Sequence, residues 1–330
     1  MIPTLLRLVV LLAVSMGTPT TLAQRSPSGG NDSSDAASQL DPILLHAKSL
    51  LENASVPEAE RLTRSYLESH PTSADAHFLL GLILFKEVRA KESLAEYTTA
   101  ARYRDPSAYE LEMVALNYVL LNDYMDADKW LSKSVQMDSH NWESWYYLGR
   151  TKYNENRFNE AVNAFQQALK LSPMNVKAED NLGLSYDGLG RQQEAEEAYR
   201  KAIRWQSQLL QEDPGPYLDL GILLIDRNRP QDAIPYLRRA SQISPHDPKA
   251  HEQLGKAYAG MGRLPEAQVE LEKAVEASPN DGALHYVLGQ IYRREGMKDK
   301  AQAEFEKLAA LKSMQGGTQA NGPADAASRH

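Results

Sequence analysis

The feature of this sequence that most constrains its fold is a repeat of 34 residues. Glycines recur at this spacing, alanines recur twelve residues after each glycine, and prolines close several units at one phase. The glycines are Gly149, Gly183, Gly221, Gly255 and Gly289, the alanines are Ala127, Ala161, Ala195, Ala233, Ala267 and Ala301, and the prolines are Pro173, Pro245 and Pro279. One interval of 38 residues interrupts the glycine and alanine series. Such a period predicts an array of stacked units that share one continuous core.

Each unit has the pattern of two amphipathic helices joined by a short turn. In the unit 142–175, Leu148 precedes the glycine, and Phe165 follows Ala161 by four positions and precedes Ala168 by three. Offsets of three and four place side chains on one face of a helix. We expect the small residues to let the two helices approach closely and the large residue to fill the space beside them. Proline should then end the second helix, because it cannot donate to the preceding turn.

This arrangement resembles the tetratricopeptide repeat family, whose pattern W-x2-L-G-x2-Y…A-x3-F…P has the same length. One unit matches it at Trp145, Leu148, Gly149, Ala161, Phe165, Ala168 and Pro173, and departs from it at Lys152, where the family favours tyrosine. The resemblance implies an all-α, right-handed α-solenoid of about eight helical hairpins. The expected units are 40–73, 74–107, 108–141, 142–175, 176–209, 214–247, 248–281 and 282–315, with a four-residue insertion at 210–213.

The insertion lies in the stretch from Trp205 to Pro216. Four residues make about one helical turn, so we expect the second helix of that unit to run one turn longer. Leu209 and Leu210 favour this interpretation. The alternative is a longer loop, because the sequence 212–216 has to leave the helix after the leucines.

The N-terminus reads as a secretory signal peptide at residues 1–23. Arg7 gives a positive start, Leu8–Met16 is apolar apart from one serine, and small residues precede a cleavage point after Ala23. The alternative is an uncleaved membrane anchor, although the apolar run is about half of the ~20 residues that span a bilayer. Residues 24–39 and 316–330 are polar, which favours a disordered linker and a disordered tail. We expect export, to the periplasm or the extracellular space if the protein is bacterial, and no membrane span in the mature chain.

Composition argues against several classes of function. The net charge of −8 disfavours a nucleic-acid partner, and the absence of cysteine excludes disulfides and thiolate metal sites. His77, His251 and His285 fall where the repeat prefers tryptophan, so we expect them to pack rather than to bind a metal. There is no phosphate-binding loop, no G-x-S-x-G, no dinucleotide fingerprint and no H-E-x-x-H. We therefore expect no enzyme, no catalytic residue, no metal site and no cofactor.

The family resemblance implies a concave groove, lined by the first helix of each hairpin, that holds a protein or peptide segment. The residues expected in this groove are Phe78, Leu82, Phe85, Tyr109, Leu116, Tyr146, Arg150, Tyr153, Asn181, Leu184, Leu218, Ile222 and Ile225. An exposed apolar stripe of this kind is typical of a binding surface. The alternative is that these side chains pack on neighbouring helices. The resulting hypothesis is a non-enzymatic exported scaffold for protein–protein interaction or complex assembly.

Two other interpretations stay open. Trp142, Tyr146, Tyr147 and Tyr153 have rings that can stack on sugars, which favours a module that binds glycans or cell-envelope polymers. Repeat arrays usually need a capping element, and the C-terminal hairpin shows none, so it can also mediate self-association.

Overall fold

The computed structural model describes residues 40–207 and 209–319. These residues form sixteen α-helices and no strand, which confirms the all-α solenoid of helical hairpins. They divide into two compact units, with the boundary between Ser172 and Pro173. The expected signal peptide and linker lie outside the described residues. Among the described residues, no helix is both long enough and apolar enough to cross a membrane.

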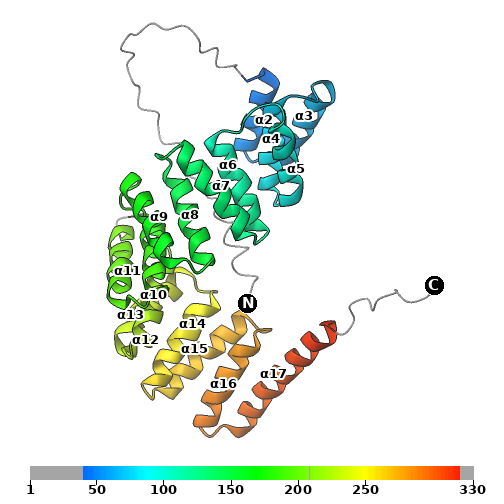
Figure 1. Ribbon diagram of the computed structural model, residues 1–330. Coiled ribbons are helices and arrows are strands. Elements are labelled where there is room, and N and C mark those ends of the chain that lie inside the picture. The colour runs from blue at the N-terminus through cyan, green and yellow to red at the C-terminus, as the bar shows by residue number, and fades with distance from the viewer. Residues whose placement is uncertain (1–39, 208, 320–330) are drawn as a thin grey trace, which may run out of the picture. The chain divides into compact units, whose positions relative to one another are not determined.

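The first unit contains four hairpins, drawn from blue to green in Figure 1. Their helices are α2 (Pro42–Glu52), α3 (Val56–Ser69), α4 (Ala74–Lys86), α5 (Ala90–Ala100), α6 (Ala108–Leu120), α7 (Tyr124–Met137), α8 (Trp142–Asn154) and α9 (Phe158–Leu171). The two helices of a hairpin pack on each other, and the second helices α3, α5 and α7 also pack on the first helix of the next hairpin. The first helices α2, α4, α6 and α8 contact one another in sequence.

The second unit repeats this arrangement. Its helices are α10 (Val176–Gly188), α11 (Gln192–Gln206), α12 (Gly215–Asp226), α13 (Pro230–Ile243), α14 (Pro248–Gly260), α15 (Leu264–Ala277), α16 (Gly282–Arg294) and α17 (Lys298–Gln319). The first helices α10, α12 and α14 contact one another in sequence. A buried core of leucine, alanine and tyrosine runs through these hairpins and includes Tyr199, Leu220, Leu254 and Leu288.

Close approach of the two helices depends on the repeated glycine. A Cβ on Gly149 would lie 2.8 Å from the ring of Phe165, and a Cβ on Gly221 would lie 2.3 Å from Leu237. The same relationship joins Gly81 to Tyr97, Gly183 to Tyr199, Gly255 to Leu271 and Gly289 to Phe305. The expected role of the glycine and of the large residue sixteen positions later is therefore confirmed. Proline is confirmed as the stop signal too, since α9, α13 and α15 each end two residues before one.

The turn between the helices of each hairpin contains one residue with a left-handed backbone. These residues are Ala54, Val88, Asn122, Asn156, Gly190, Asn228, Gly262 and Gly296, and they follow the repeat spacing, including its one longer interval. Glycine and asparagine tolerate this conformation, whereas a β-branched side chain is strained in it. Val88, with φ of 63°, is the member whose side chain fits its backbone least well.

The starts of the first helices are capped by short polar side chains. Asp41, Ser73, Ser107, Asn141, Asn175, Asp247 and Asp281 each accept a hydrogen bond from a backbone N–H in the first turn of the helix that follows. Such caps satisfy donors that have no partner inside the helix. The start of α12 differs, because Pro214 occupies the cap position and makes no such bond.

The three histidines in the tryptophan slot connect the helices of their hairpins. In His251, Nδ1 lies 2.7 Å from a carboxylate oxygen of Glu270, and Nε2 lies 3.1 Å from the carbonyl oxygen of Pro245. His77 and His285 make the equivalent pairs of contacts. Trp145 donates its Nε1–H to the carbonyl oxygen of Ser139, which is also six residues earlier. Histidine at this position therefore makes the same contact as tryptophan, to the carbonyl oxygen six residues earlier. It also bonds a carboxylate on the second helix of its hairpin.

The insertion does not lengthen α11 by a turn, so that expectation was wrong. The helix ends at Gln206, and it has 15 residues where α9, α13 and α15 have 14. The prolines and glycine at 214–216 require a turn, and the additional residues form part of the loop that makes this turn.

At the C-terminal end of the second compact unit, α17 continues to Gln319, four residues into the segment expected to be a disordered tail. The rest of that segment lies outside the described residues.

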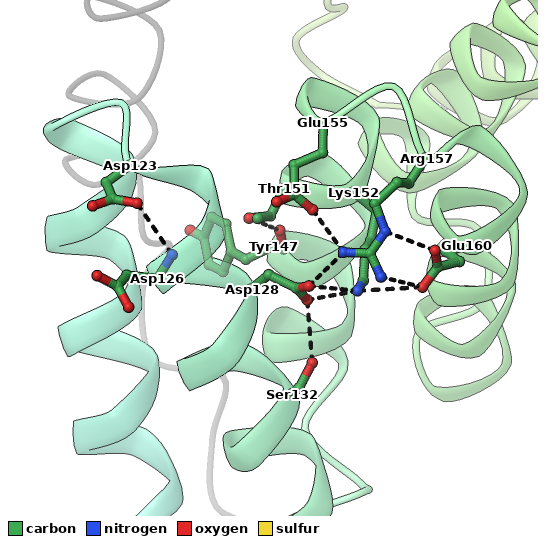
Figure 2. Close-up of polar contacts among 10 residues, drawn as sticks. All are labelled: Asp123, Asp126, Asp128, Ser132, Tyr147, Thr151, Lys152, Glu155, Arg157 and Glu160. Carbon is green, nitrogen blue, oxygen red and sulfur yellow. Dashed lines mark hydrogen bonds and ion pairs between the residues drawn. The ribbon is translucent and has the colours of Figure 1, made fainter.

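Lys152, the departure from the family pattern, makes a buried link between two hairpins (Figure 2). Its Nζ lies 2.7 Å from Asp128 on α7 and 3.3 Å from Glu160 on α9, and its side chain is 9% exposed. Arg157 also binds Asp128, at 2.6 Å, and Glu160, at 2.6 Å. Burial would raise the pKa of Asp128, but the two cations outweigh it and hold that pKa below its ordinary value. The carboxylate is therefore ionised and stabilises the α7–α8 contact.

The tyrosines at this position make a similar link. Tyr258 accepts a hydrogen bond of 2.6 Å from Arg238, and Tyr292 donates one of 2.7 Å to Glu272. In both cases the partner lies on the second helix of the preceding hairpin. Lysine and tyrosine share a long apolar stem and a polar tip, so either can carry a bond across this interface.

Candidate functional site

The residues expected in the groove lie on the first helices α4, α6 and α8 of the first unit and α10 and α12 of the second. Phe78, Phe85, Leu116 and Tyr146 are buried, whereas Leu82, Arg150, Tyr153, Asn181, Leu184, Leu218, Ile222 and Ile225 are half-buried and Tyr109 is exposed. The two units therefore differ in how much of the expected surface a partner can reach.

In the first unit, the expected aromatic residues pack largely within the core. Tyr146 as a residue is 6% exposed, and the centroid of its ring lies 5.9 Å from that of Phe165 and 5.5 Å from that of Tyr147. Phe78 packs 5.9 Å from Tyr97 in the same manner. These rings offer little surface for a ligand, because the second helix of their own hairpin already covers them. This geometry also leaves Tyr146 little surface for stacking on a sugar.

In the second unit, apolar side chains remain accessible on two adjacent first helices. Leu184 on α10, and Leu218 and Ile225 on α12, are half-buried against the core of the unit. Ile222 lies on α12 between the last two and is also half-buried. Because α10 and α12 contact each other, these residues supply an apolar surface that is supported by the core and open to solvent. We call Leu184, Leu218, Ile222 and Ile225 the apolar row.

Asn181 uses part of its hydrogen-bonding capacity within its own helix. Its Nδ2 donates to the carbonyl oxygen of Lys177 at 2.8 Å, and its backbone carbonyl accepts a hydrogen bond from Ser185. Its side-chain oxygen and the second N–H of its amide are the groups that a ligand can still engage.

A buried acid in the first unit was missed by the sequence analysis. Glu112 on α6 is 2% exposed and accepts hydrogen bonds from Ser144 and, at 3.0 Å, from Asn141. Burial raises the pKa of Glu112 to about 7, against the opposing effect of these two donors, and nearby Glu143 adds to the rise. The signal in the sequence is its position, because Glu112 is the fifth residue of its unit, where neighbouring units have Phe78 and Tyr146.

Asp180 occupies the same fifth position in the unit 176–209. Glu112 and Asp180 are thus buried acids at a position that is aromatic in the units 74–107, 142–175 and 282–315. Within the part of the chain that the structure describes, no three histidine or acidic side chains are grouped so that they could hold a metal ion.

Family comparisons agree with this architecture. Models described as tetratricopeptide repeat match residues 44–109 and 146–215, residues 224–291 and residues 283–313, which together span more than half of the chain. The chain belongs to the tetratricopeptide repeat family.

Solved structures with the same fold cover most of this chain. A tetratricopeptide repeat protein from Parabacteroides merdae covers 76% of it with a TM-score of 0.60 at 16% identity, and the match spans 97% of that protein. The Cut9–Hcn1 hetero-tetramer of the APC/C covers 82% with a TM-score of 0.57 at 21% identity, over 52% of the matched chain. PilW, a type IV pilus biogenesis factor, covers 62% with a TM-score of 0.55 at 22% identity, over 92% of that chain. At these identities the likeness concerns the fold.

Curated relatives match over shorter stretches. The human protein O-mannosyl-transferase TMTC3 is 30% identical over 106 residues, which are 30% of this chain and 12% of that protein. Human tetratricopeptide repeat protein 33 is 30% identical over 95 residues, which are 29% of this chain and 36% of that protein. This chain thus corresponds to a small part of the first relative and about a third of the second.

Proposed function

We propose that this protein is a non-enzymatic scaffold that binds a segment of another protein on the first helices of its hairpins. The observation that carries this proposal is the apolar row on α10 and α12, which is half-buried against a packed core and remains open to solvent. A surface of this kind gains free energy when a partner covers it, at roughly 25 cal/mol per Å² of apolar area. The family relationship supports protein–protein interaction as the general role.

The rigidity of the surface supports the same role. Both helices are fixed by their own second helices and by each other, so a bound segment would not have to order them. A preformed site binds with a smaller loss of conformational entropy than a flexible one. The scaffold would therefore hold an extended or helical segment in a defined register.

Binding is tested with a display library of random peptides and the full chain. Ile222→Glu places a charge in the apolar row, and Val269→Glu places the same charge on an exposed apolar residue of the second helix α15. We expect peptides selected on the native chain to lose binding to Ile222→Glu and to keep binding to Val269→Glu. Equal binding to both variants would exclude the apolar row as the site.

Calorimetry with the same full chain distinguishes the scaffold proposal from the glycan-binding alternative. Calorimetry against cell-envelope polysaccharides should give no heat if the scaffold proposal is right, because Tyr146 packs on Phe165 and Tyr147. Heat with polysaccharides and none with selected peptides would contradict the scaffold proposal.

We propose that the scaffold acts after export, in the periplasm or outside the cell if the protein is bacterial. The support is the sequence of residues 1–23, which combines Arg7, an apolar run and a small-residue cleavage point. Fusing residues 1–39 to alkaline phosphatase, which is active only after export, tests this location. An inactive fusion, with an active control carrying a known signal peptide, would rule it out.

A further inference from the structure

Three carboxyl groups of the second unit lie near one another where the repeat spacing is interrupted, although among the described residues they are not grouped closely enough to hold a metal ion. Asp180 lies on α10, Asp219 lies on α12, and Asp213 lies in the segment that joins α11 to α12. Asp180 and Asp213 approach each other beside Gly215, since a Cβ on that glycine would lie 3.3 Å from Oδ2 of Asp180 and 3.1 Å from Oδ1 of Asp213. Asp219 lies near enough for its negative charge to raise the pKa of Asp180. We call Asp180, Asp213 and Asp219 the acidic triad.

One oxygen of the triad has no partner. Asp180 as a residue is 9% exposed, and its Oδ1 receives no hydrogen bond from any described residue. A buried acceptor without a donor typically costs about 1–3 kcal/mol, and more if it is charged. Such an atom in a native fold needs an explanation, and a donor from a bound molecule would supply one.

Burial and mutual repulsion oppose the ionisation of Asp180 and Asp219. Burial raises the pKa of Asp180 well above its ordinary value, and the neighbouring Asp219 and Asp213 raise it further. Burial likewise raises the pKa of Asp219, with Asp213 and Asp187 adding to the effect. Like charges at close range disfavour ionisation, and a cation between them would reverse that effect.

The interrupted repeat is what brings Asp213 to this place. Buried Gln206 accepts a hydrogen bond of 2.9 Å from the N–H of Asp213 and donates one of 3.1 Å to its carbonyl oxygen. Asp213 in turn accepts a bond of 2.8 Å from the N–H of Gly215 at the start of α12. The inserted residues thus form a loop that is fixed at Asp213, and they give this hairpin junction a carboxylate that an uninterrupted repeat would not provide.

We infer that the acidic triad is a subsite for one lysine or arginine side chain of the bound protein segment. This inference rests on the proposed function, because it specifies the chemistry of the segment that lies on α10 and α12. An ammonium or guanidinium group supplies both the missing N–H donor and the missing positive charge. Leu184 follows Asp180 by one turn, and Ile222 follows Asp219 by one turn, so the apolar row can cover the aliphatic stem of the same side chain.

A second pair of acids extends the same surface. Asp187 and Asp226 lie seven residues after Asp180 and Asp219, which is about two turns along α10 and α12. Burial and the charge of Asp226 raise the pKa of Asp187. The seam between these two helices is therefore acidic along two turns, and a segment with several basic residues would match it.

Two synthetic peptides of one length test the subsite. The first, acetyl-Leu-Lys-Leu-Arg-Leu-amide, has two cations, and the second has glutamine in place of lysine and arginine. Affinities are measured by calorimetry with the native chain, with Asp180→Asn/Asp219→Asn, and with Asp299→Asn, an exposed acid on α17. The double variant removes charge at nearly constant volume, so we expect it to fold and to resist heat at least as well as the native chain.

We expect the native chain and Asp299→Asn to bind the basic peptide at least about tenfold more tightly than the glutamine peptide. We expect the double variant to lose this preference. Equal affinity of the native chain for the two peptides would overturn the subsite while leaving the scaffold proposal intact. Binding of neither peptide at millimolar concentration would overturn the subsite, and the peptide library would decide the scaffold proposal separately. A calcium-induced rise in Tm that the double variant abolishes would overturn it in favour of a metal site.

Discussion

The Nζ of Lys152 lies 2.7 Å from Oδ1 of Asp128, across the contact between two hairpins of the first unit. This pair takes the place of the tyrosine links that Tyr258 and Tyr292 make in the second unit. The ion pair lies inside the contact between the hairpins and not on the surface, because the lysine side chain is buried.

Replacing this lysine should weaken the first unit. Lys152→Ala leaves Asp128 half-buried with Arg157 as its remaining cation, and it opens space beside α7. Removing one partner of a buried pair typically lowers the free energy of unfolding by about 3–5 kcal/mol. Because Arg157 remains beside Asp128, we expect a loss of about 3 kcal/mol. Urea denaturation followed by circular dichroism measures it, with Lys91→Ala on the exposed face of α5 as the control. Equal stability of the two variants would show that the pair contributes nothing.

Relieving the strained turn at Val88 should stabilise the protein. Its φ of 63° suits asparagine, which occupies the equivalent place at Asn122, Asn156 and Asn228. Because the side chain is 41% exposed, Val88→Asn loses little burial and should add about 1 kcal/mol to the free energy of unfolding. Gly190→Val, which places valine at the equivalent position of another hairpin, should destabilise the protein by a similar amount. Thermal melts of both variants check whether each change raises or lowers the stability.

The packing of glycine against the large residue predicts a sharp difference between two alanine substitutions. Gly149→Ala places a Cβ 2.8 Å from Phe165 and should cost about 1–3 kcal/mol through overpacking. Gly260→Ala lies at the end of α14 with no neighbouring atom within 4 Å, so it should be neutral or stabilising by about 0.5 kcal/mol. Comparable destabilisation by both substitutions would contradict the idea that glycine is needed at position 149 because the two helices approach closely there.

Glu112 should make the stability of the first unit depend on pH. Its pKa in the folded chain is raised to about 7, so the folded state binds its proton more tightly than the unfolded state. The resulting stabilisation is fully present below the ordinary pKa of a glutamic acid and is lost as the pH rises through about 7. Glu112→Gln, which can still accept hydrogen bonds from Ser144 and Asn141, should be more stable than the native chain at about pH 8, by up to about 3 kcal/mol.

Denaturation curves at several pH values measure this effect. The difference between Glu112→Gln and the native chain should grow from about pH 5 to about pH 8. Glu58→Gln, which changes an exposed acid on α3, should give no such trend. A difference that stays constant with pH would show that Glu112 is not protonated preferentially in the folded state.

The sequence by itself determined the elements and their pairing. Glycine, the large apolar residue and proline recur at fixed offsets, and each offset has a local meaning: close approach, filling of the interface and the end of a helix. Spacing along a helix fixes which side chains share a face, so these roles follow from the period. The hairpins and the family could therefore be predicted with no knowledge of tertiary contacts.

Only the tertiary structure decided which side chains are accessible. Tyr146 and Ile222 both lie on first helices, yet Phe165 and Tyr147 cover Tyr146, while Ile222 remains half-open. The roles of Lys152 and of the acidic triad depend on partners more than twenty residues away. Periodicity describes one helix at a time, whereas burial and electrostatics depend on the helices packed against it, and in this chain those belong both to the same hairpin and to its neighbours.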